Sequence, residues 1–317
     1  MSARRWSIAI FTARETPATL AETIAAVGVA CAEVPSTIDI VVNGNRALAE
    51  IMAARLDRFD CSPRSRLRVW FVALGDKAHA WNQYIETIVP DGETVFFVDG
   101  YARLAPDSLR LIDDALDENA EAWAASGVPT VGRSARRLRE RMQIEGGIHG
   151  NLYALRGSVV ARLRSRGFRL PLAIYRNDSL LGAVVCFSAD PKAHRWNPQR
   201  IAVVPGATWS NETLCWTRWS SVVTQWKRML RQAQGALENA AVRQHLAHDR
   251  LPPESLPANT RELIERWRAA HPDDARALLR HPLRRQAARK LAEPRDWSDC
   301  AVPAELLAEA PSRDGAI

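Results

Sequence analysis

Strand-length apolar runs alternate with longer stretches that predict helices in the first half of the chain. The second of these runs ends in Asn43-Gly-Asn45, which is a turn signal. Strands separated by helices imply crossover connections and a mainly parallel sheet. The predicted strands are Trp6–Ala13, Ile38–Val42, Leu67–Ala73 and Thr94–Val98, and the predicted helices are Pro17–Cys31, Arg46–Phe59, Lys77–Ile88 and Pro106–Asn119.

The pattern is less regular in the second half. Glycine and arginine dominate from Gly127 to Gly150, which predicts loop and an edge strand there. Leu152–Leu155 and Val159–Arg164 follow as a short strand and a helix, and Trp219–Ala247 is a long helical pattern.

A proline pair in Leu251-Pro-Pro253 marks the expected domain boundary. We therefore predict an α/β domain over residues 1–250 and a helical C-terminal extension over residues 251–317. The extension is expected to contain short arginine-rich helices and a mobile tail after Pro311. These helices are predicted at Thr260–Ala270, Asp273–Leu279 and Leu283–Leu291.

Composition narrows the class of protein. With 317 residues and 47% hydrophobic content, the chain can bury a large core, which excludes a disordered or fibrous protein. Its apolar runs fall well short of the roughly 18 residues that a membrane helix needs, so we expect no membrane span. The run after Arg4-Arg5 is too short for a secretion signal and is interpreted as the first strand. Five scattered cysteines without a Cys-x-x-Cys pair argue against disulfides and zinc and favour the cytoplasm.

The net charge of +7 is concentrated in the middle of the chain. Residues 133–200 hold 14 Lys or Arg against 4 Asp or Glu, whereas residues 1–132 hold 12 against 18. Such a block suits a phosphorylated substrate, anionic lipid headgroups or nucleic acid, and a solvated helix face around Arg136–Arg141 is the alternative. No nucleic-acid recognition motif accompanies the charge, so we expect no nucleic acid as a partner.

One acid stands at the end of the fourth predicted strand. Asp99 follows the run Thr94–Val98 and precedes a glycine bend, and Pro106 then opens a helix. Open α/β folds bind ligands at the carboxyl ends of strands, and a carboxylate there can hold a hard divalent cation that bridges phosphates. The alternative is that Asp99 caps the turn at Pro106.

A second acid, Asp178, follows the apolar segment Leu170–Tyr175 and lies at the start of a predicted helix. No other acid occurs between residues 150 and 189. The position suits a general base for an incoming hydroxyl, and it suits an N-terminal helix cap as well.

Two residues of the predicted long helix, Gln225 and Arg228, are three positions apart and therefore share one face. An arginine there can bind phosphate oxygens in a forked geometry, and Arg231 with Gln232 follows about one turn later. An exposed basic helix face is the alternative.

Four segments in this order resemble glycosyltransferase family 2, whose members have the GT-A fold. They are Gly75-Asp-Lys-Ala-His-Ala-Trp-Asn82, the strand and helix start from Thr94 through Asp99 to Leu109, Arg176-Asn-Asp178-Ser-Leu-Leu181, and Gln225-Trp-Lys-Arg228-Met229. The resemblance covers about residues 6–235. It implies an inverting transferase that moves a sugar from a nucleotide-diphosphate donor to an acceptor hydroxyl, with Mg²⁺ or Mn²⁺ at the donor phosphates.

The resemblance also implies roles for single residues. Asp178 matches the general base, and Asp99 matches a metal ligand. The donor-binding positions are Asn43, Lys77, Asn82, Asp99, Tyr101, Gln225 and Arg228, and the acceptor-side positions are Gly147, Asn151 and Tyr153. For Asn43 a plain turn is the alternative, and for the segment around Lys77 the alternative is a helix cap at Asp76.

The chain departs from the family pattern at several of these positions. Tyr101 replaces the second acid of an Asp-x-Asp motif, Asn177 replaces the acid before the base, and Met229 replaces a tryptophan. The implied acceptor is a sugar, a lipid-linked molecule or a peptide, and peripheral contact with a membrane is compatible with the absence of a span.

Two other functions compete with glycosyl transfer. A noncatalytic or repurposed GT-A domain that binds a nucleotide or a partner is suggested by Tyr101 and Asn43. A nucleotidyltransferase is disfavoured because Thr12–Pro17 lacks the glycine-rich loop with a basic residue that such enzymes place on a triphosphate.

Overall fold

The computed structural model describes residues 4–59, 61–90, 94–130, 135–211 and 219–312. Side chains of residues 219–225 lie outside this description. The strands are β1 (Trp6–Thr12), β2 (Ser36–Asn43), β3 (Ser65–Val72), β4 (Thr94–Asp99), β5 (Arg103–Leu104), β6 (Ala124–Pro129), β7 (Leu152–Arg156), β8 (Ile201–Ser210) and β9 (Glu305–Ala310).

Helices connect and cover these strands. The α-helices are α1 (Pro17–Ala30), α2 (Arg46–Ala53), α3 (Lys77–Gln83), α4 (Ser108–Glu118), α5 (Ala135–Glu145), α6 (Gly157–Ser165), α7 (Asn177–Cys186), α8 (Trp219–Arg243), α9 (Thr260–Ala270), α10 (Pro272–Leu279) and α11 (Pro282–Ala292). Short π-helical segments, Tyr84–Ile88 and Gln244–His248, extend α3 and α8. Short 3₁₀ turns are Leu56–Arg58, Pro198–Arg200, Pro253–Ser255 and Ser298–Ala301.

Polar side chains fix the starts of several helices. Thr16, Asn45, Asp76 and Asn259 precede α1, α2, α3 and α9, and each accepts a hydrogen bond from a backbone amide of the first turn. Each such bond pairs an amide that would otherwise lack an intrahelical partner. The cap at Asp76 confirms one of the alternatives drawn from the sequence.

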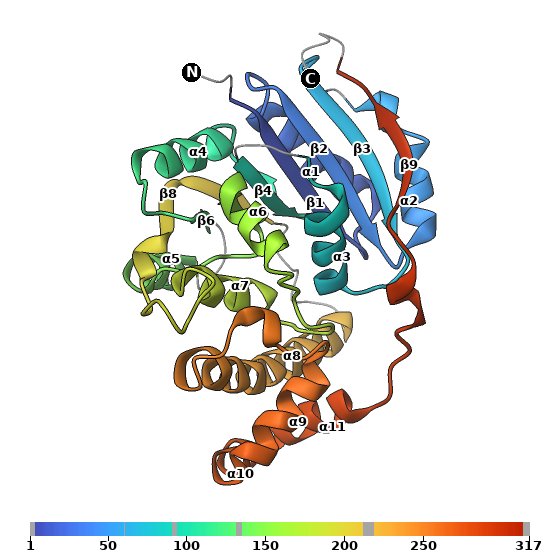
Figure 1. Ribbon diagram of the computed structural model, residues 1–317. Coiled ribbons are helices and arrows are strands. Elements are labelled where there is room, and N and C mark those ends of the chain that lie inside the picture. Colours follow the sequence, from blue (N-terminus) through green and yellow to red (C-terminus); the bar gives the residue numbers. More distant parts are fainter. Residues whose placement is uncertain (1–3, 60, 91–93, 131–134, 212–218, 313–317) are drawn as a thin grey trace.

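The described strands form one mixed sheet in the order β5-β8-β6-β7-β4-β1-β2-β3-β9 (Figure 1). Strands β3, β2, β1 and β4 are mutually parallel, and β7 is antiparallel to β4. The register pairs Thr12 with Val42 and Phe11 with Asp99, so β1, β2 and β4 end at one edge of the sheet. This edge is where a doubly wound fold binds its ligands.

Two hydrophobic clusters cover the two faces of the sheet. Alternate residues of β1 point to opposite faces: Ile8 and Ile10 belong to the cluster with α1, α2 and α4, whereas Ala9 and Phe11 belong to the cluster with α3, α6, α7 and α8. All seven residues of β1 are buried, as expected for a central strand covered on both sides. The fold is thus a helix-flanked, mostly parallel sheet, and the sequence prediction of this class is confirmed.

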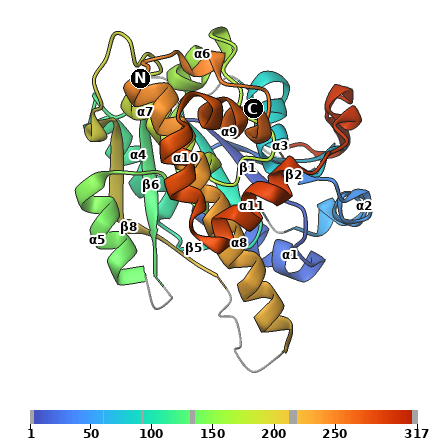
Figure 2. The ribbon, with the colours of Figure 1, turned by 90° about the horizontal axis from the view of Figure 1, so that it is seen from below.

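Helix α8 lies below the carboxyl ends of the parallel strands in Figure 1, together with α9 and α11. It contacts α7, α9 and α11, and Figure 2 shows α11 beside α8. Helices α9 and α11 therefore pack against α8 at this end of the fold.

The prediction for Gly127–Gly150 was wrong. The strand β6 lies inside the sheet between β7 and β8 and is not an edge strand, and α5 occupies Ala135–Glu145. Among the residues of α5 only Ala135 and Met142 are buried. An arginine-rich helix with so few apolar contacts lacks the periodic pattern by which a helix is identified in a sequence.

The C-terminal extension contains the three predicted helices, and it also contains a strand that the sequence prediction did not include. Strand β9 pairs antiparallel with β3, so Ala308 lies opposite Val69 at the edge of the sheet. The division of the chain at residue 250 remains a prediction. The pairing shows that residues 305–310 are part of the central sheet.

Candidate functional site

A cleft of about 510 Å³ lies at the carboxyl ends of β1, β2 and β4. Its walls come from the turns after these strands, the start of α3, the loops before β7 and α7, and one face of α8. The lining residues are Phe11–Glu15, Asn43, Gly75, Lys77, Asp99, Tyr101, His149–Asn151, Ile174–Asp178, Arg228, Arg231 and Gln232. Most of the residues singled out in the sequence therefore meet at one place.

Asp99 is buried at the base of this cleft and is held by two neighbours. Lys77 Nζ forms an ion pair with Asp99 Oδ1, and the Tyr101 hydroxyl lies 3.0 Å from Asp99 Oδ2 and 3.2 Å from Asn151 Oδ1. Burial and the adjacent Asp99 carboxylate raise the pKa of Tyr101, which therefore keeps its proton as a donor. The side chain of Asp99 faces the cleft rather than capping the turn at Pro106.

A divalent ion would have to compete with these contacts. Asp99 offers a single carboxylate, one oxygen of which is paired with Lys77 while the other accepts from Tyr101. No cluster of three or more His, Cys, Asp or Glu side chains suited to a metal occurs among the described residues. As they stand, these side chains do not fit a metal ion, because Lys77 already provides the positive charge beside Asp99.

Asp178 lies across the cleft in the first turn of α7. Its Oδ2 accepts from Gly150 N at 3.3 Å, and its Oδ1 accepts from Ser179 N at 2.9 Å. A Cβ atom at Gly150 would lie 3.6 Å from Lys77 Nζ and 3.7 Å from Asp178 Oδ2. The absence of a side chain at Gly150 thus leaves space between Asp178 and the Lys77–Asp99 pair.

The segment that leads to Asp178 is anchored by helix α8. The buried Glu238 accepts from Tyr175 N at 2.9 Å and from Arg176 N at 3.0 Å, and Gln234 Nε2 donates to Glu238 at 2.7 Å. Burial raises the pKa of Glu238, although the hydrogen bonds from these partners oppose that shift. The helix that carries the arginines of the cleft therefore also fixes the backbone just before Asp178.

A second carboxylate anchors the same segment from the opposite side. Asp76 Oδ1 caps α3 through His79 N at 2.9 Å, and its Oδ2 accepts from Ala173 N at 2.8 Å. The amide of Asn43, oriented to satisfy its neighbours, donates to Thr12 O at 3.0 Å and accepts from Asp76 N at 3.2 Å. Asn43 thereby ties the ends of β1 and β2 to the start of α3.

Glycine is required where the turns after β2 and β3 touch. Gly44 has φ of 69°, and a Cβ there would lie 2.4 Å from the Cα of Gly75. A side chain at Gly44 would force these two turns apart, so glycine keeps them in contact beside Asn43.

Arg228, Arg231 and Gln232 bring helix α8 into the cleft. The prediction that Arg231 follows Arg228 by about one helical turn is confirmed, and both residues line the cleft. The side chain of Gln225 falls outside the described residues. Its role in donor binding stays a prediction.

Three other predicted site residues lie away from the cleft surface. Both amide atoms of Asn82 bond the backbone of Leu170, at 2.9 and 2.8 Å, and the Tyr153 hydroxyl accepts from Trp81 Nε1 at 3.0 Å. Gly147 has φ of 141° and open space around it. Asn82 and Tyr153 thus contribute packing and hydrogen bonds behind the cleft.

Several lining residues escaped the sequence prediction, among them the ionisable residues His149 and Glu15. The ring of His149 lies 4.7 Å from that of Trp209, and burial lowers the pKa of His149, partly offset by Asp178 and Asp99. Burial opposes ionisation of Glu15 as well, yet hydrogen bonds from Thr12 Oγ1 and backbone amides lower its pKa overall. No motif surrounds either residue, and only the fold brings them to the cleft.

None of the helices in the described part of the chain combines the length and the apolar character needed to cross a bilayer.

A scan against protein-family models finds no match, and a search of curated proteins finds none either. Solved structures do match. The mannosyltransferase PcManGT from Pyrobaculum calidifontis, in complex with GDP-Man and Mn²⁺, has a TM-score of 0.55 at 17% identity over 92% of this chain and 85% of that chain. Glucosyl-3-phosphoglycerate synthase from Mycobacterium tuberculosis, with Mn²⁺, UDP and glucosyl-3-phosphoglycerate, has a TM-score of 0.50 at 15% identity over 74% and 78%. The structure of the same enzyme with Mg²⁺ and UDP has a TM-score of 0.50 at 14% identity, and the match covers 78% of this chain and 80% of that chain. The chain therefore has the GT-A fold of nucleotide-sugar transferases, as the sequence predicts.

Proposed function

We propose that this protein is a glycosyltransferase that moves a sugar from a nucleoside-diphosphate donor to an acceptor hydroxyl with inversion at the anomeric carbon. The observation that carries the proposal is a single cleft at the strand ends, in which Asp178 faces the Lys77–Asp99 pair. The GT-A fold supports it further, because the related structures hold nucleotides or a nucleotide sugar.

The donor is held through charge and hydrogen bonds. Lys77, Arg228 and Arg231 provide positive charge for the diphosphate, which must be stabilised as it departs with the bonding electron pair. Asn43 and Tyr101 offer polar atoms for the nucleoside, and Asn151 lies on the acceptor side of Asp99.

Asp178 acts as the general base. Its carboxylate takes the proton of the acceptor hydroxyl while the hydroxyl oxygen bonds to the anomeric carbon, and the bond from that carbon to the diphosphate breaks. One displacement of this kind inverts the configuration. The acceptor is a sugar, a lipid-linked molecule or a peptide.

We propose that Lys77 supplies at Asp99 the positive charge that a metal provides elsewhere. The related structures were determined with Mn²⁺ or Mg²⁺. Here an ion at Asp99 would compete with the Lys77 ammonium and the Tyr101 hydroxyl. Binding of the nucleoside diphosphate should accordingly depend little on added metal.

A second carboxylate beside Asp99 should make the site bind a divalent metal more tightly. In Tyr101→Asp we expect the Mn²⁺ affinity of the nucleotide-bound protein to rise by about tenfold or more. Mutation of residues that only hydrogen-bond to metal ligands already changes metal affinity by about that factor. Isothermal titration with Mn²⁺ measures the change, and Tyr101→Phe is the control that removes the hydroxyl without adding charge. Equal Mn²⁺ binding by the wild type and Tyr101→Asp would count against the position assigned to Tyr101.

A screen of nucleotide sugars tests the function itself. A thermal-shift screen first identifies the nucleotide, because a ligand of the folded state raises its melting temperature. Asp99→Ala should then lower kcat/KM for release of the nucleoside diphosphate by about 10- to 100-fold, the worth of a charged hydrogen bond. Asp107→Ala is the control, because Asp107 is exposed and pairs only with Arg110. Equal kcat/KM values in Asp99→Ala and Asp107→Ala would mean that Asp99 has only a structural role.

The second candidate is a GT-A domain that binds a nucleotide without turnover, favoured by Tyr101 at the position of an acid. Nucleotide binding with no product for any donor and acceptor pair would support it. We also propose a cytoplasmic location, since Cys31 and Cys186 are buried thiols outside any disulfide.

A further inference from the structure

A second cavity, of about 370 Å³, adjoins the cleft on the side of the C-terminal extension. The two spaces share Arg14, Gly75, Lys77, Ile174, Tyr175 and Arg231. Basic side chains dominate its walls and come from separate parts of the fold. They are Arg14 after β1, Lys77 at the start of α3, Lys227 and Arg231 on α8, Lys290 on α11 and Arg295 beyond it, and Figure 2 shows α8 and α11 side by side.

Few carboxylates balance these six cations. Among the described residues of the lining the only acid is Asp76, whose two oxygens accept from His79 N and Ala173 N. Lys77 is paired with Asp99, whereas the other five cations form no ion pair with a carboxylate of the described residues. In α9, by contrast, Arg261 and Arg266 are paired with glutamates of the same helix.

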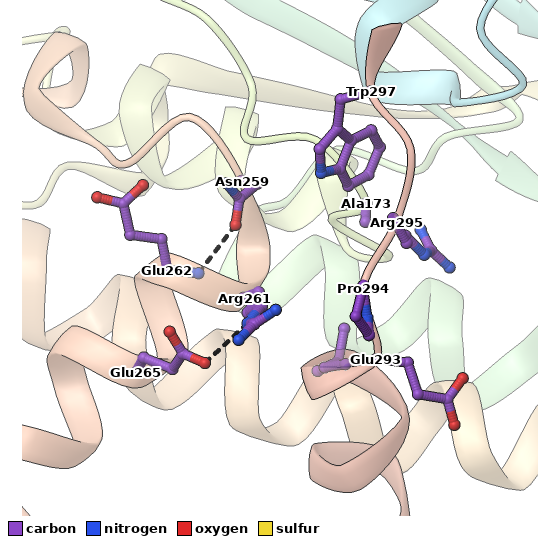
Figure 3. A pocket seen from close by; sticks show the side chains of 10 residues that line it. Ala173, Asn259, Arg261, Glu262, Glu265, Glu293, Pro294, Arg295 and Trp297 are labelled. Carbon is purple, nitrogen blue, oxygen red and sulfur yellow. Dashed lines mark hydrogen bonds and ion pairs between the residues drawn. The ribbon is translucent and has the colours of Figure 1, made fainter.

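A neighbouring pocket of the extension has a different charge, so the positive charge of the basic cavity is not a general property of pockets in the extension. Figure 3 shows a pocket of about 360 Å³ between α9 and the segment after α11, in which Arg261 is bonded to Glu265 and Glu293 lies at the rim. That pocket shares Arg295 with the basic cavity, yet its acids outnumber its cations. These acids distinguish that pocket from the basic cavity, which adjoins the cleft.

Cations gathered in one concave site repel each other and create a positive local potential that attracts anions. The helix dipole accounts for a lysine in the last turn of α11, but it does not account for the convergence of Lys290 with cations of three other segments. Arginine and lysine together match the oxygens of a phosphate group.

We propose that this cavity is an oxyanion-binding site for a phosphate group carried by a substrate, with Lys290 and Arg295 as the cations that the C-terminal extension contributes. The proposal rests on the function proposed above and extends it. The phosphate belongs either to the acceptor or to the nucleotide donor, since both would enter through the adjoining cleft. In either case residues 282–295 complete the substrate site.

The test compares wild type with Lys290→Ala/Arg295→Ala by isothermal titration at low ionic strength, where exposed charges are screened least. Inorganic phosphate is titrated into the protein alone and into the protein saturated with the nucleoside diphosphate that it binds. We expect the double variant to bind phosphate about tenfold or more weakly, because charged hydrogen bonds are lost. Arg280→Ala/Arg289→Ala removes two exposed arginines that do not line the cavity and should leave phosphate binding unchanged.

The two sources of phosphate give different results. Phosphate that still binds after saturation with the nucleoside diphosphate indicates the acceptor, whereas phosphate that is displaced, together with weaker nucleotide binding by the double variant, indicates the donor. The proposal would be overturned if phosphate did not bind the wild type, or if it bound the wild type and Lys290→Ala/Arg295→Ala with equal affinity. An equal loss of phosphate affinity in Arg280→Ala/Arg289→Ala would overturn it as well. Nucleotide binding to the wild type tests the proposed function separately. Melting temperatures of both double variants verify that they are folded.

Discussion

Asp178→Asn should lower turnover by about 10² to 10⁴ while donor affinity stays nearly unchanged, because the variant loses a general base and little else. The amide is nearly isosteric, and its oxygen can still accept from Ser179 N or Gly150 N. Steady-state kcat and the dissociation constant of the donor, measured on the same preparation, separate the chemical step from binding.

His149→Gln is the comparison variant, because the imidazole lines the same cleft as Asp178 and is also able to accept a proton. Burial lowers its pKa, so the imidazole stays neutral as the pH falls below the ordinary histidine value of about 6.5. His149→Gln should therefore retain most of the activity. A loss confined to His149→Gln, or a product with retained anomeric configuration, would show that Asp178 is not the base.

Lys77→Met should weaken binding of the nucleoside diphosphate and lower turnover by about 10² to 10³, the cost of removing one preorganised charge from a developing anion. The substitution keeps the length of the side chain, removes its charge and leaves Asp99 without its ion pair. Titration calorimetry and kcat measure the two effects.

Lys77→Arg is expected to restore part of the loss, and Lys192→Ala removes an exposed lysine that lines none of the described cavities. Unchanged donor affinity in Lys77→Met would mean that Lys77 only neutralises Asp99. Divalent metal that fully rescues Lys77→Met would show that an ion can take the place of the ammonium.

The parallel half of the fold was predictable because its strands are buried on both faces. Runs such as Val95–Val98 are apolar throughout, and Pro17 and Asp76 mark helix starts by side-chain chemistry alone. Strand β9 was not predictable in this way. Its sequence, Glu-Leu-Leu-Ala-Glu-Ala, consists of good helix formers, and it is extended because β3 offers an unpaired edge.

The position of a residue in the cleft was predictable where that residue ends a strand or begins a helix, as with Asp99 and Asp178. It was not predictable where function depends on contacts between distant segments. His149 reaches the cleft through a loop with no distinctive pattern, and Lys290 reaches the adjoining cavity through packing of α11 on α8. Asn82 and Tyr153 fit the family pattern, but their polar atoms are bonded to Leu170 and Trp81.

The attachment of Glu238 to the backbone at Tyr175 and Arg176 limits how this protein can evolve. Helix α8 presents Arg228 to the cleft and at the same time holds the loop before Asp178, so a shift of α8 that admits a new donor would also move the proposed base. Selection for a different nucleotide would then act more readily at Asn43 and Gly75 in the turns of the opposite wall, provided that Asp76 keeps its own bond to Ala173 N in that loop. We infer that donor preference can diversify at these turns while α8 changes slowly.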